Sequence, residues 1–588
     1  MSIVIDDKKI TNINISNKNV QKIVDILTNK IIFEKTSSNE YFYIENTYNG
    51  SNTISLKTTT GSSNTTGSHA TQLQYSKDKE TWTTITLSGT NTIPINSGER
   101  VYFRNDSGGF NWYANSKDMF YTQINCSNKH KVGGNINSLL DYNNYNVAIT
   151  PYCFYQLFYE NKYLTDANEL IFSKTSLAKS CYTSMFYGCT SLTTAPIELP
   201  ATTLADSCYS SMFEGCTSLT TAPTELPATT LANYCYQNMF YKCTSLTTAP
   251  ALPATTLANY CYQNMFSGCT SLTTAPKLPS TTLVRSCYQN MFYGCTSLTT
   301  APALPATTLA DYCYQSMFRD CTSLTVAPAL PATTVKEFCY REMFYGCTSL
   351  TTAPTELPAT TLSNYCYYNM FNGCTSLTNA PTELPATTLV KSCYNNMFNS
   401  CTSLTTAPAL PATTLASSCY SSMFQNCTSL TNVPTELPAT TLTESCYQYM
   451  FRGCTSLNTT PKLPSTTLAN YCYTSMFRDC TSLTTAPALP ATTLADYCYQ
   501  SMFNGCSKLT TAPALPATTL TNYCYRGIFE NCASLNSITV YANDVSATDC
   551  TYSWLLGVAN SGTFRNLGSA TYPTGASGIP SGWTEVKN

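Results

Sequence analysis

The stretch LPATTLANYCYQNMFSGCTSLTTAP, residues 252–276, decides the fold, because it is one copy of a unit that recurs fourteen times between Cys181 and about Leu535. The first cysteine of each copy is one of the following: Cys181, Cys208, Cys235, Cys261, Cys287, Cys313, Cys339, Cys366, Cys393, Cys419, Cys446, Cys472, Cys498 and Cys524. Successive copies are therefore 26 or 27 residues apart. The longer step occurs where the turn reads IELP or TELP, with glutamates Glu198, Glu225, Glu356, Glu383 and Glu436. A length change confined to one turn is typical of a solenoid of stacked repeats.

Each unit is predicted to contain one short helix and one short strand. In the segment 259–269, Cys261, Met265 and Cys269 are spaced i, i+4, i+8, which places them on one face of a helix. The segment 270–275 is rich in threonine, which favours a strand, and the prolines after it end that strand. The remaining inward set is Phe266, Leu272, Ala275, Leu278 and Leu283. The fold class predicted is an α/β repeat solenoid, with a short helix plus a short strand in each 26–27-residue repeat.

The charge of the chain restricts its partners. Charged residues make up 11% of the 588 residues, and the formal net charge is −2. Because no basic stripe is visible, we expect no nucleic-acid binding. We expect no membrane insertion either, because no run of about 18 apolar residues occurs. The first twenty residues show no pattern of a secretory signal, so no export route is expected.

The repeat resembles the BspA-like leucine-rich-repeat family, whose units carry an aromatic residue, a cysteine and a leucine at three-residue spacing, followed by a strand and a proline-containing turn. Phe266, Cys269 and Leu272 match this pattern, as do their equivalents in every copy. The resemblance covers about 400 residues and implies a solenoid of the leucine-rich-repeat type that acts in surface adhesion rather than in catalysis. The additional cysteine at Cys261 and its equivalents departs from the family pattern.

The flanks of the array predict further units. A degenerate copy begins at Cys153 and has Asn161 where the second cysteine belongs, as expected for a terminal repeat. Strand-like alternation between residues 40 and 126 predicts a β-sandwich, with Trp82, Ile85, Val101 and Phe103 in its core. Trp554, Phe564 and Trp583 are expected to close the last repeat. The predicted divisions are a β-rich attachment segment at 1–39, a β-sandwich-like domain at 40–135, a cap at 136–180, the array at 181–535 and a second cap at 536–588.

Residues 1–35 contain a short internal echo of isoleucines and valines between asparagine-rich turns: Ile10, Ile13, Ile15, Val20, Ile23, Ile26 and Ile31. This segment resembles the short β-elements at the N-terminus of tailed-phage tail and fibre proteins. The resemblance implies attachment to other virion proteins.

Of the 31 cysteines, 28 form fourteen pairs with seven residues between the two members, which is not the spacing of a zinc site. Within one helix the two members of a pair would lie about 12 Å apart, beyond the reach of a disulfide. We therefore predict that each is a small buried side chain in a stacked column. Disulfides between repeats stay open as an alternative, and neither a metal nor a cofactor is expected.

Other candidate residues have ordinary structural explanations. His69 and His130 are the two histidines of the chain, both lie outside the array, and both are interpreted as turn or domain-edge residues. The five turn glutamates are interpreted as loop residues rather than a glycosidase pair. The tyrosines after the first cysteines, from Tyr182 to Tyr525, are assigned to the core, with an aromatic platform for sugar as the alternative. No catalytic site is predicted, and the ligand-binding residues stay unknown.

A comparison among the copies indicates where the surface lies. The strand segment is almost unchanged, whereas three pairs vary, namely 258–259, 263–264 and 267–268 in the quoted copy. We predict that these pairs face solvent. Variation there fits either ligand specificity or sequence drift on a surface that binds nothing. The paired threonines of TSLTT are expected to form hydroxyl ladders along the array.

Together these observations predict a non-enzymatic phage virion structural protein, a tail fibre or head-surface decoration, located on the virion surface. It would contact other virion proteins through its N-terminal region, and a host-surface protein or polysaccharide through the array. A homo-oligomer is compatible with this role. The alternative is a bacterial BspA-like adhesin on the cell surface. A capsule depolymerase and an intracellular effector are less favoured, because no catalytic set and no specific soluble partner are indicated.

Overall fold

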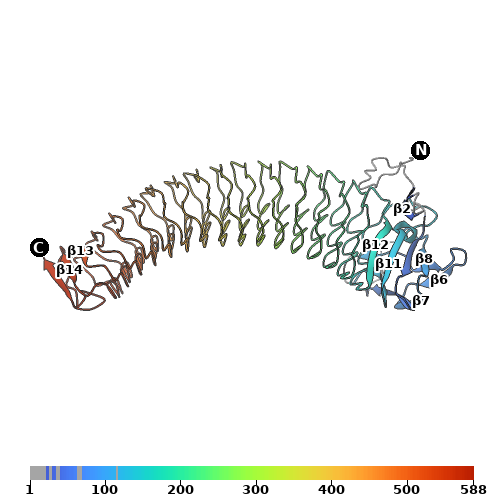
Figure 1. Ribbon diagram of the computed structural model, residues 1–588, viewed down its shortest axis with the longest axis horizontal. Helices are drawn as coiled ribbons and strands as arrows, with labels where there is room; N and C mark the ends of the chain where they lie inside the picture. Colours follow the sequence, from blue (N-terminus) through green and yellow to red (C-terminus); the bar gives the residue numbers. More distant parts are fainter. Residues whose placement is uncertain are drawn as a thin grey trace.

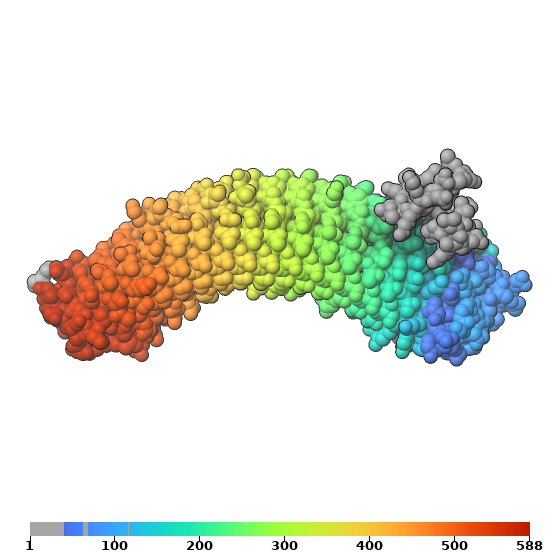
Figure 2. All heavy atoms as spheres, viewed as in Figure 1, coloured from blue at the N-terminus to red at the C-terminus, as the bar shows by residue number. Residues whose placement is uncertain are grey.

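The computed structural model describes residues 22–25, 30–34, 40–62, 69–113, 115 and 117–587. The repeats stack side by side into a long arc (Figure 1). A β-rich N-terminal part lies at one end of the arc, and strands β13 and β14 lie at the other. Drawn as spheres, the array is a continuous curved rod (Figure 2). The surface that it offers is therefore long and built from the same few repeat positions.

The predicted α/β solenoid, with a helix and a strand in each repeat, is wrong. Among the described residues no α-helix occurs, and the single helical element is the short 3₁₀ helix η1, Ile136–Leu139. The segment predicted as a helix is a series of four-residue turns. One residue in four has left-handed backbone: φ is 59° at Tyr260, 55° at Asn264 and 76° at Gly268. Successive left-handed residues at this spacing are incompatible with a right-handed helix.

Hydrogen bonding explains why turns replace the helix. The N–H groups of alternate residues from Cys261 to Cys269 donate to the carbonyl three residues earlier, at 3.0–3.3 Å. The N–H groups between them, from Tyr260 to Gly268, donate to carbonyls of the next repeat, at 2.7–3.1 Å. A helix would use nearly all of these groups within itself and leave none to join the repeats. The turns therefore form local structure and hold neighbouring repeats together at once.

The predicted strand is also wrong in most of the array. The segment TSLTTA contributes one-residue parallel bridges instead, as between Thr248 and Thr274 and between Thr274 and Thr300. The predicted inward residues are nevertheless correct, since Cys261, Met265 and Cys269 are fully buried. A spacing of four residues fits a four-residue turn as well as it fits a helix, so the pattern located the core without distinguishing the backbone.

Two aromatic columns run through the core. The tyrosines that follow the first cysteines stack ring on ring, with centroids 5.4–5.9 Å apart from Tyr182 to Tyr525. The phenylalanines from Phe186 to Phe529 do the same at 5.2–5.7 Å. Offset stacking adds to the stabilisation from area burial, and it occurs at every interface between these repeats.

The cysteines are small buried side chains, as predicted, and every one is a free thiol. The second cysteine of each of the fourteen copies also donates a hydrogen bond. Its Sγ lies 3.0–3.2 Å from the carbonyl oxygen of the phenylalanine in the preceding repeat, as Cys269 does with Phe240. Burial raises the pKa of Cys269 to about 12, so the thiol keeps its proton and acts as the donor.

The N-terminal part consists of strands in two sheets. One sheet has the order β7-β4-β10-β9 and the other β12-β11-β3-β8-β5-β6. Their bounds are β3 Phe42–Asn46, β4 Asn52–Thr60, β5 Gln72–Ser76, β6 Thr83–Thr86, β7 Thr90–Ile95, β8 Arg100–Arg104, β9 Trp112–Tyr113, β10 Met119–Cys126, β11 His130–Asn135 and β12 Leu164–Ile171. Of the four predicted core residues, Val101 and Phe103 are buried and Ile85 is partly buried. Trp82 was wrongly assigned, because its side chain is partly exposed.

The array continues directly from the N-terminal sheets. Strand β12 belongs to the degenerate first copy and pairs in parallel with β11, so the six-stranded sheet continues into the repeats. Asn161, which replaces the second cysteine, donates from Nδ2 to the carbonyl of Ile124 at 3.1 Å and contacts His130 Nε2 at 3.1 Å. It therefore supplies the donor that the second cysteine supplies in each of the fourteen copies that follow.

The other end is closed by strands β13 Ser537–Val540, β14 Gly562–Asn566 and β15 Trp583–Lys587, which pair in parallel. Trp554, Phe564 and Trp583 are buried there, as predicted. A further degenerate copy, not predicted from the sequence, starts at Cys550, which lies 26 residues after Cys524. Asp549, Ser553 and Gly557 repeat the left-handed pattern of the turns.

Of the predicted attachment segment 1–39, the structure describes only β1, Lys22–Asp25, and β2, Lys30–Glu34. These two strands pair in antiparallel orientation. The rest of the segment lies outside the described residues, so its attachment role stays a prediction.

Two neighbouring tyrosines of the core column provide a test of its polar contacts. The hydroxyl of Tyr473 lies 3.2 Å from Ser465 Oγ, whereas the equally buried hydroxyl of Tyr447 has no partner among the described residues. Tyr473→Phe should lower the free energy of unfolding by about 1 kcal/mol, because it removes a made hydrogen bond. Tyr447→Phe should leave it unchanged or raise it. Urea denaturation of both variants measures the difference, and equal losses would contradict this assignment.

Candidate binding surface

The turns present one exposed edge to solvent. We call the positions equivalent to 258–260, 263–264 and 267–268 the turn face. Asn259 is exposed and Gln263 is partly exposed, as predicted, but Ser267 is buried in this copy. Its equivalent Tyr293 is 37% exposed, so the prediction of a solvent-facing position holds where the side chain is large. The face therefore varies in chemistry from copy to copy over an unvarying core.

A third aromatic column, not predicted from the sequence, lies on the turn face at the positions directly before the first cysteines. Tyr234 is 38% exposed and stacks on Tyr260 at 4.8 Å. The other stacks are Tyr312–Phe338–Tyr365 at 4.9 and 5.1 Å and Tyr471–Tyr497–Tyr523 at 4.5 Å. The remaining copies have serine at this position. This alternation between serine and a ring was the signal that could have revealed the column.

A cation bridges one gap in this column. Ser286 interrupts the stack, but the neighbouring Arg285 donates from Nε to the hydroxyl of Tyr260 at 3.1 Å. Its guanidinium carbon also lies 5.0 Å from the ring centroid of Tyr312. The contact combines a hydrogen bond with a cation–π interaction. Aromatic and cationic groups therefore follow one another without a break from Tyr234 to Tyr365.

The middle of the turn face carries a charged cluster. Glu342 is only 9% exposed and forms ion pairs with Arg319 and Arg341. Arg319 lies over the ring of Tyr345 at 4.4 Å, which leaves both arginines held in one arrangement. A carboxylate this deeply buried requires such partners. Arginine and tyrosine in a fixed arrangement are the residue types that dominate protein recognition sites.

The other tyrosine column, from Tyr182 to Tyr525, is confirmed as core. Its members are at most 2% exposed, so they form no platform for a ligand. The predicted threonine ladder is present in several copies, but its hydroxyls are engaged within the array. Thr220 Oγ1, for example, donates to the carbonyl of Thr193 at 3.1 Å, and Thr351 Oγ1 donates to Thr325 at 3.1 Å.

The five turn glutamates, Glu198, Glu225, Glu356, Glu383 and Glu436, are all exposed in their turns. Three of them take part in backbone bridges to the next repeat, as Glu225 does with Ala251. These positions agree with the interpretation as loop residues.

His130 lies at the junction between β11 and the array, and it is 1% exposed. Its Nδ1 lies 2.9 Å from the carbonyl of Asn128, and its Nε2 faces Asn161. Nδ1 therefore carries the proton, and Nε2 accepts a hydrogen bond from Asn161 Nδ2. Burial lowers the pKa of His130 to about 4. The other histidine, His69, packs its ring against Phe120 with centroids 4.2 Å apart.

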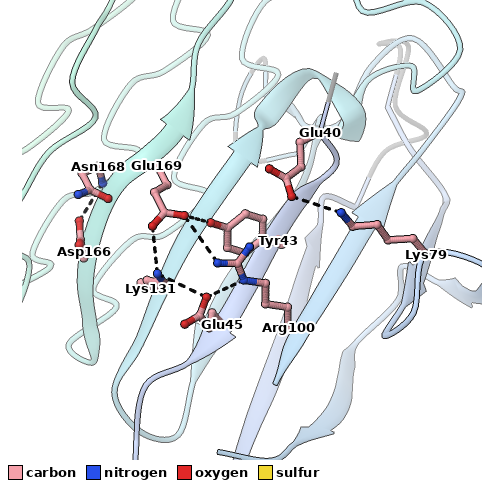
Figure 3. Close-up of polar contacts among 9 residues, drawn as sticks. All are labelled: Glu40, Tyr43, Glu45, Lys79, Arg100, Lys131, Asp166, Asn168 and Glu169. Atoms are coloured by element: carbon pink, nitrogen blue, oxygen red, sulfur yellow. Dashed lines mark hydrogen bonds and ion pairs between the residues drawn. The ribbon is translucent and has the colours of Figure 1, made fainter. Parts of the chain in front are cut away.

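An ionic cluster ties the N-terminal sheet to the first repeat (Figure 3). Glu45 on β3 pairs with Arg100 at 2.6 Å and with Lys131 at 3.4 Å. Lys131 also pairs at 3.1 Å with Glu169 on β12, which accepts a hydrogen bond from Tyr43. Burial opposes ionisation, but these bonds lower the pKa of Glu169. Because each acid is paired with a base, the cluster acts as a clamp across four strands.

In the described part of the chain, no group of three or more histidine, cysteine and acidic residues is placed to hold a metal ion. No helix in that part is long and apolar enough to cross a membrane.

Comparisons with known proteins follow the repeat. The profile described as "BspA type Leucine rich repeat region (6 copies)" matches residues 142–265, 237–372, 341–449 and 418–553. These matches together cover more than half of the chain. No curated protein matches the chain. The crystal structure of a leucine-rich repeat protein from Bacteroides ovatus aligns with a TM-score of 0.35 and 15% sequence identity, over 77% of this chain and 92% of that one.

The buried histidine predicts how stability depends on pH. The folded state keeps His130 neutral down to about pH 4, whereas the unfolded state takes up a proton near its ordinary pKa of 6.5. The histidine should therefore lower the free energy of unfolding by about 2 kcal/mol between pH 7 and pH 5. Urea denaturation at both pH values measures this loss, and His130→Gln should lack it. Equal pH dependence in the two proteins would show that His130 is accessible to protons in the folded state.

Proposed function

The chain belongs to the BspA-type leucine-rich-repeat family, and from that premise we propose that it is a non-enzymatic adhesin displayed on a bacterial cell surface. Its array would be the adhesive part, and its partner a protein or polysaccharide of a host surface. Proteins with repeats of this type are typically found at the cell surface. A long array of identical backbone units suits such a role, since it repeats one exposed edge many times.

The observation that carries the proposal is the contrast between core and turn face. The buried cysteine, tyrosine and phenylalanine positions scarcely change between copies, whereas the exposed positions carry arginine, glutamate, tyrosine, asparagine or serine. The charged cluster around Glu342 is the densest set of such groups. We infer that ligand contact centres there, because a preorganised arginine loses little freedom on binding.

The virion role predicted from the sequence gains no support from the comparisons. The resemblance to phage tail proteins rests on residues 1–35, most of which lie outside the described residues. The repeat family supports the cell-surface alternative instead, so we favour the adhesin.

Location is tested by immunogold labelling of intact cells of the producing bacterium and of purified phage particles from the same culture. The adhesin assignment expects gold on the cell envelope. Gold confined to particles would overturn it and restore the virion role.

Binding is tested with the purified full-length protein on cultured epithelial cells. The double variant Arg319→Ala/Arg341→Ala should weaken saturable binding tenfold or more, since arginines of this kind contribute on the order of 2 kcal/mol each when they are central to an interface. The control, Lys277→Ala/Lys462→Ala, removes the same charge from exposed turns outside the turn face. Equal weakening in both variants, or in neither, would contradict a binding site at the cluster.

A further inference from the structure

The six-stranded sheet of the N-terminal part has an outer face with an ordered arrangement of side chains. On β8, Val101 and Phe103 point into the core, so Arg100, Tyr102 and Arg104 point outward. The strand register places Arg100 opposite Glu45 on β3, and Arg104 opposite Gln74 on β5. The two arginines therefore occupy opposite ends of one exposed row.

The cations around Arg100 are all compensated. Arg100 and Lys131 share Glu45 and Glu169, and Lys79 pairs with Glu40 at 3.3 Å (Figure 3). The cluster at this end of the row therefore carries no unpaired charge that would attract a ligand.

Arg104 differs from them. Its guanidinium carbon lies 3.9 Å from the ring centroid of Trp82 and 4.3 Å from that of Tyr142, so aromatic rings cover it. Its Nε donates to Gln74 Oε1 at 2.7 Å, which fixes the orientation of the group. Among the described residues, no carboxylate forms an ion pair with it. A charge that is partly removed from water and lacks an acidic partner is costly.

The two terminal nitrogens of the guanidinium form no hydrogen bond or ion pair among the described residues. Two parallel N–H groups in a rigid plane match the two oxygens of a carboxylate. Trp82 is itself held, since its Nε1 donates to the carbonyl of Lys79 at 3.1 Å and its ring packs edge-on against Tyr41 at 4.9 Å. The site is therefore rigid before any ligand arrives.

We propose that Arg104 and its aromatic clamp bind the carboxylate of an acidic sugar within a polysaccharide. The groups beside Arg104 are the amide of Gln74, which donates to Thr84 Oγ1 at 3.4 Å, and the hydroxyl-bearing rings of Tyr41 and Tyr142. Amides and hydroxyls are suited to the hydroxyls of a sugar. The aliphatic side chain of a peptide would need an apolar pocket, and these polar neighbours do not form one.

This site goes beyond the proposed function, because it lies on the N-terminal sheet and not on the array. An adhesin without it would still bind through the turn face. A uronate-binding protein without adhesive repeats would likewise keep the site. The two proposals therefore fail independently.

The experiment uses the full-length protein and polygalacturonate oligomers, with dextran as the uncharged polymer and poly-L-glutamate as the acidic polypeptide. Calorimetry should show binding to polygalacturonate and none to dextran. Arg104→Gln should weaken that binding tenfold or more. Arg104→Lys should weaken it almost as much, because lysine keeps the charge but loses the planar pair of donors. The control Arg565→Gln removes an exposed arginine of β14, outside both proposed binding sites, and should leave binding unchanged.

Three outcomes would overturn the proposal. One is no binding to polygalacturonate by a protein whose tryptophan fluorescence shows it to be folded. Another is equal affinity in the native protein and in Arg104→Lys, which would reduce the site to a nonspecific positive charge. The third is preference for poly-L-glutamate, which would assign the clamp to an acidic protein partner instead.

Discussion

Everything in the array depends on the division of backbone N–H groups between two tasks. Within the turns, every second N–H bonds inside its own repeat and the others bond to the next repeat. This division requires one left-handed residue in four, which is unfavourable for side chains other than glycine. The bonds between repeats offset that cost at each turn. The glycines, asparagines and aspartates at these positions tolerate the conformation best, whereas the serines and tyrosines there adopt it at a cost.

This backbone restricts which side chains can occupy the interior positions and leaves the surface positions free to vary. Because equivalent residues of neighbouring repeats are joined directly, each buried side chain packs against a copy of itself, and the core becomes a set of columns. A change in one copy then disturbs two interfaces, which explains why tyrosine, phenylalanine and cysteine recur so strictly. The outward positions have no such constraint. Arginine, glutamate and exposed rings are therefore found on the turn face, where a binding protein needs variety.

The sequence located the repeat, its length, the buried positions and the closing tryptophans, because these follow from spacing and hydrophobicity. It did not distinguish a helix from successive turns, since Cys261, Met265 and Cys269 fit both. Strict four-residue spacing, with serine, asparagine or glycine at every fourth place, was the available sign. The column of Tyr234 and Tyr260 was not predicted, because serine replaces the ring in several copies and interrupts the pattern. The Arg104 clamp brings together β8 and two loops, and no local pattern reveals such a contact.

The junction between the N-terminal sheets and the repeat array joins these two parts into one body. Strand β12 belongs both to the six-stranded sheet and to the first repeat, and the buried residues of the two parts form one continuous core. At this joint Asn161 Nδ2 contacts the carbonyl of Ile124 and His130 Nε2, and the pairs of Lys131 and Arg100 with Glu169 cross the joint on the outer face. A ligand on the N-terminal sheet and one on the turn face would therefore be held at a fixed separation. Binding two sites on one rigid support raises the effective concentration of the second site. Two modest surfaces can then give firm attachment only where a target presents both ligands at that spacing.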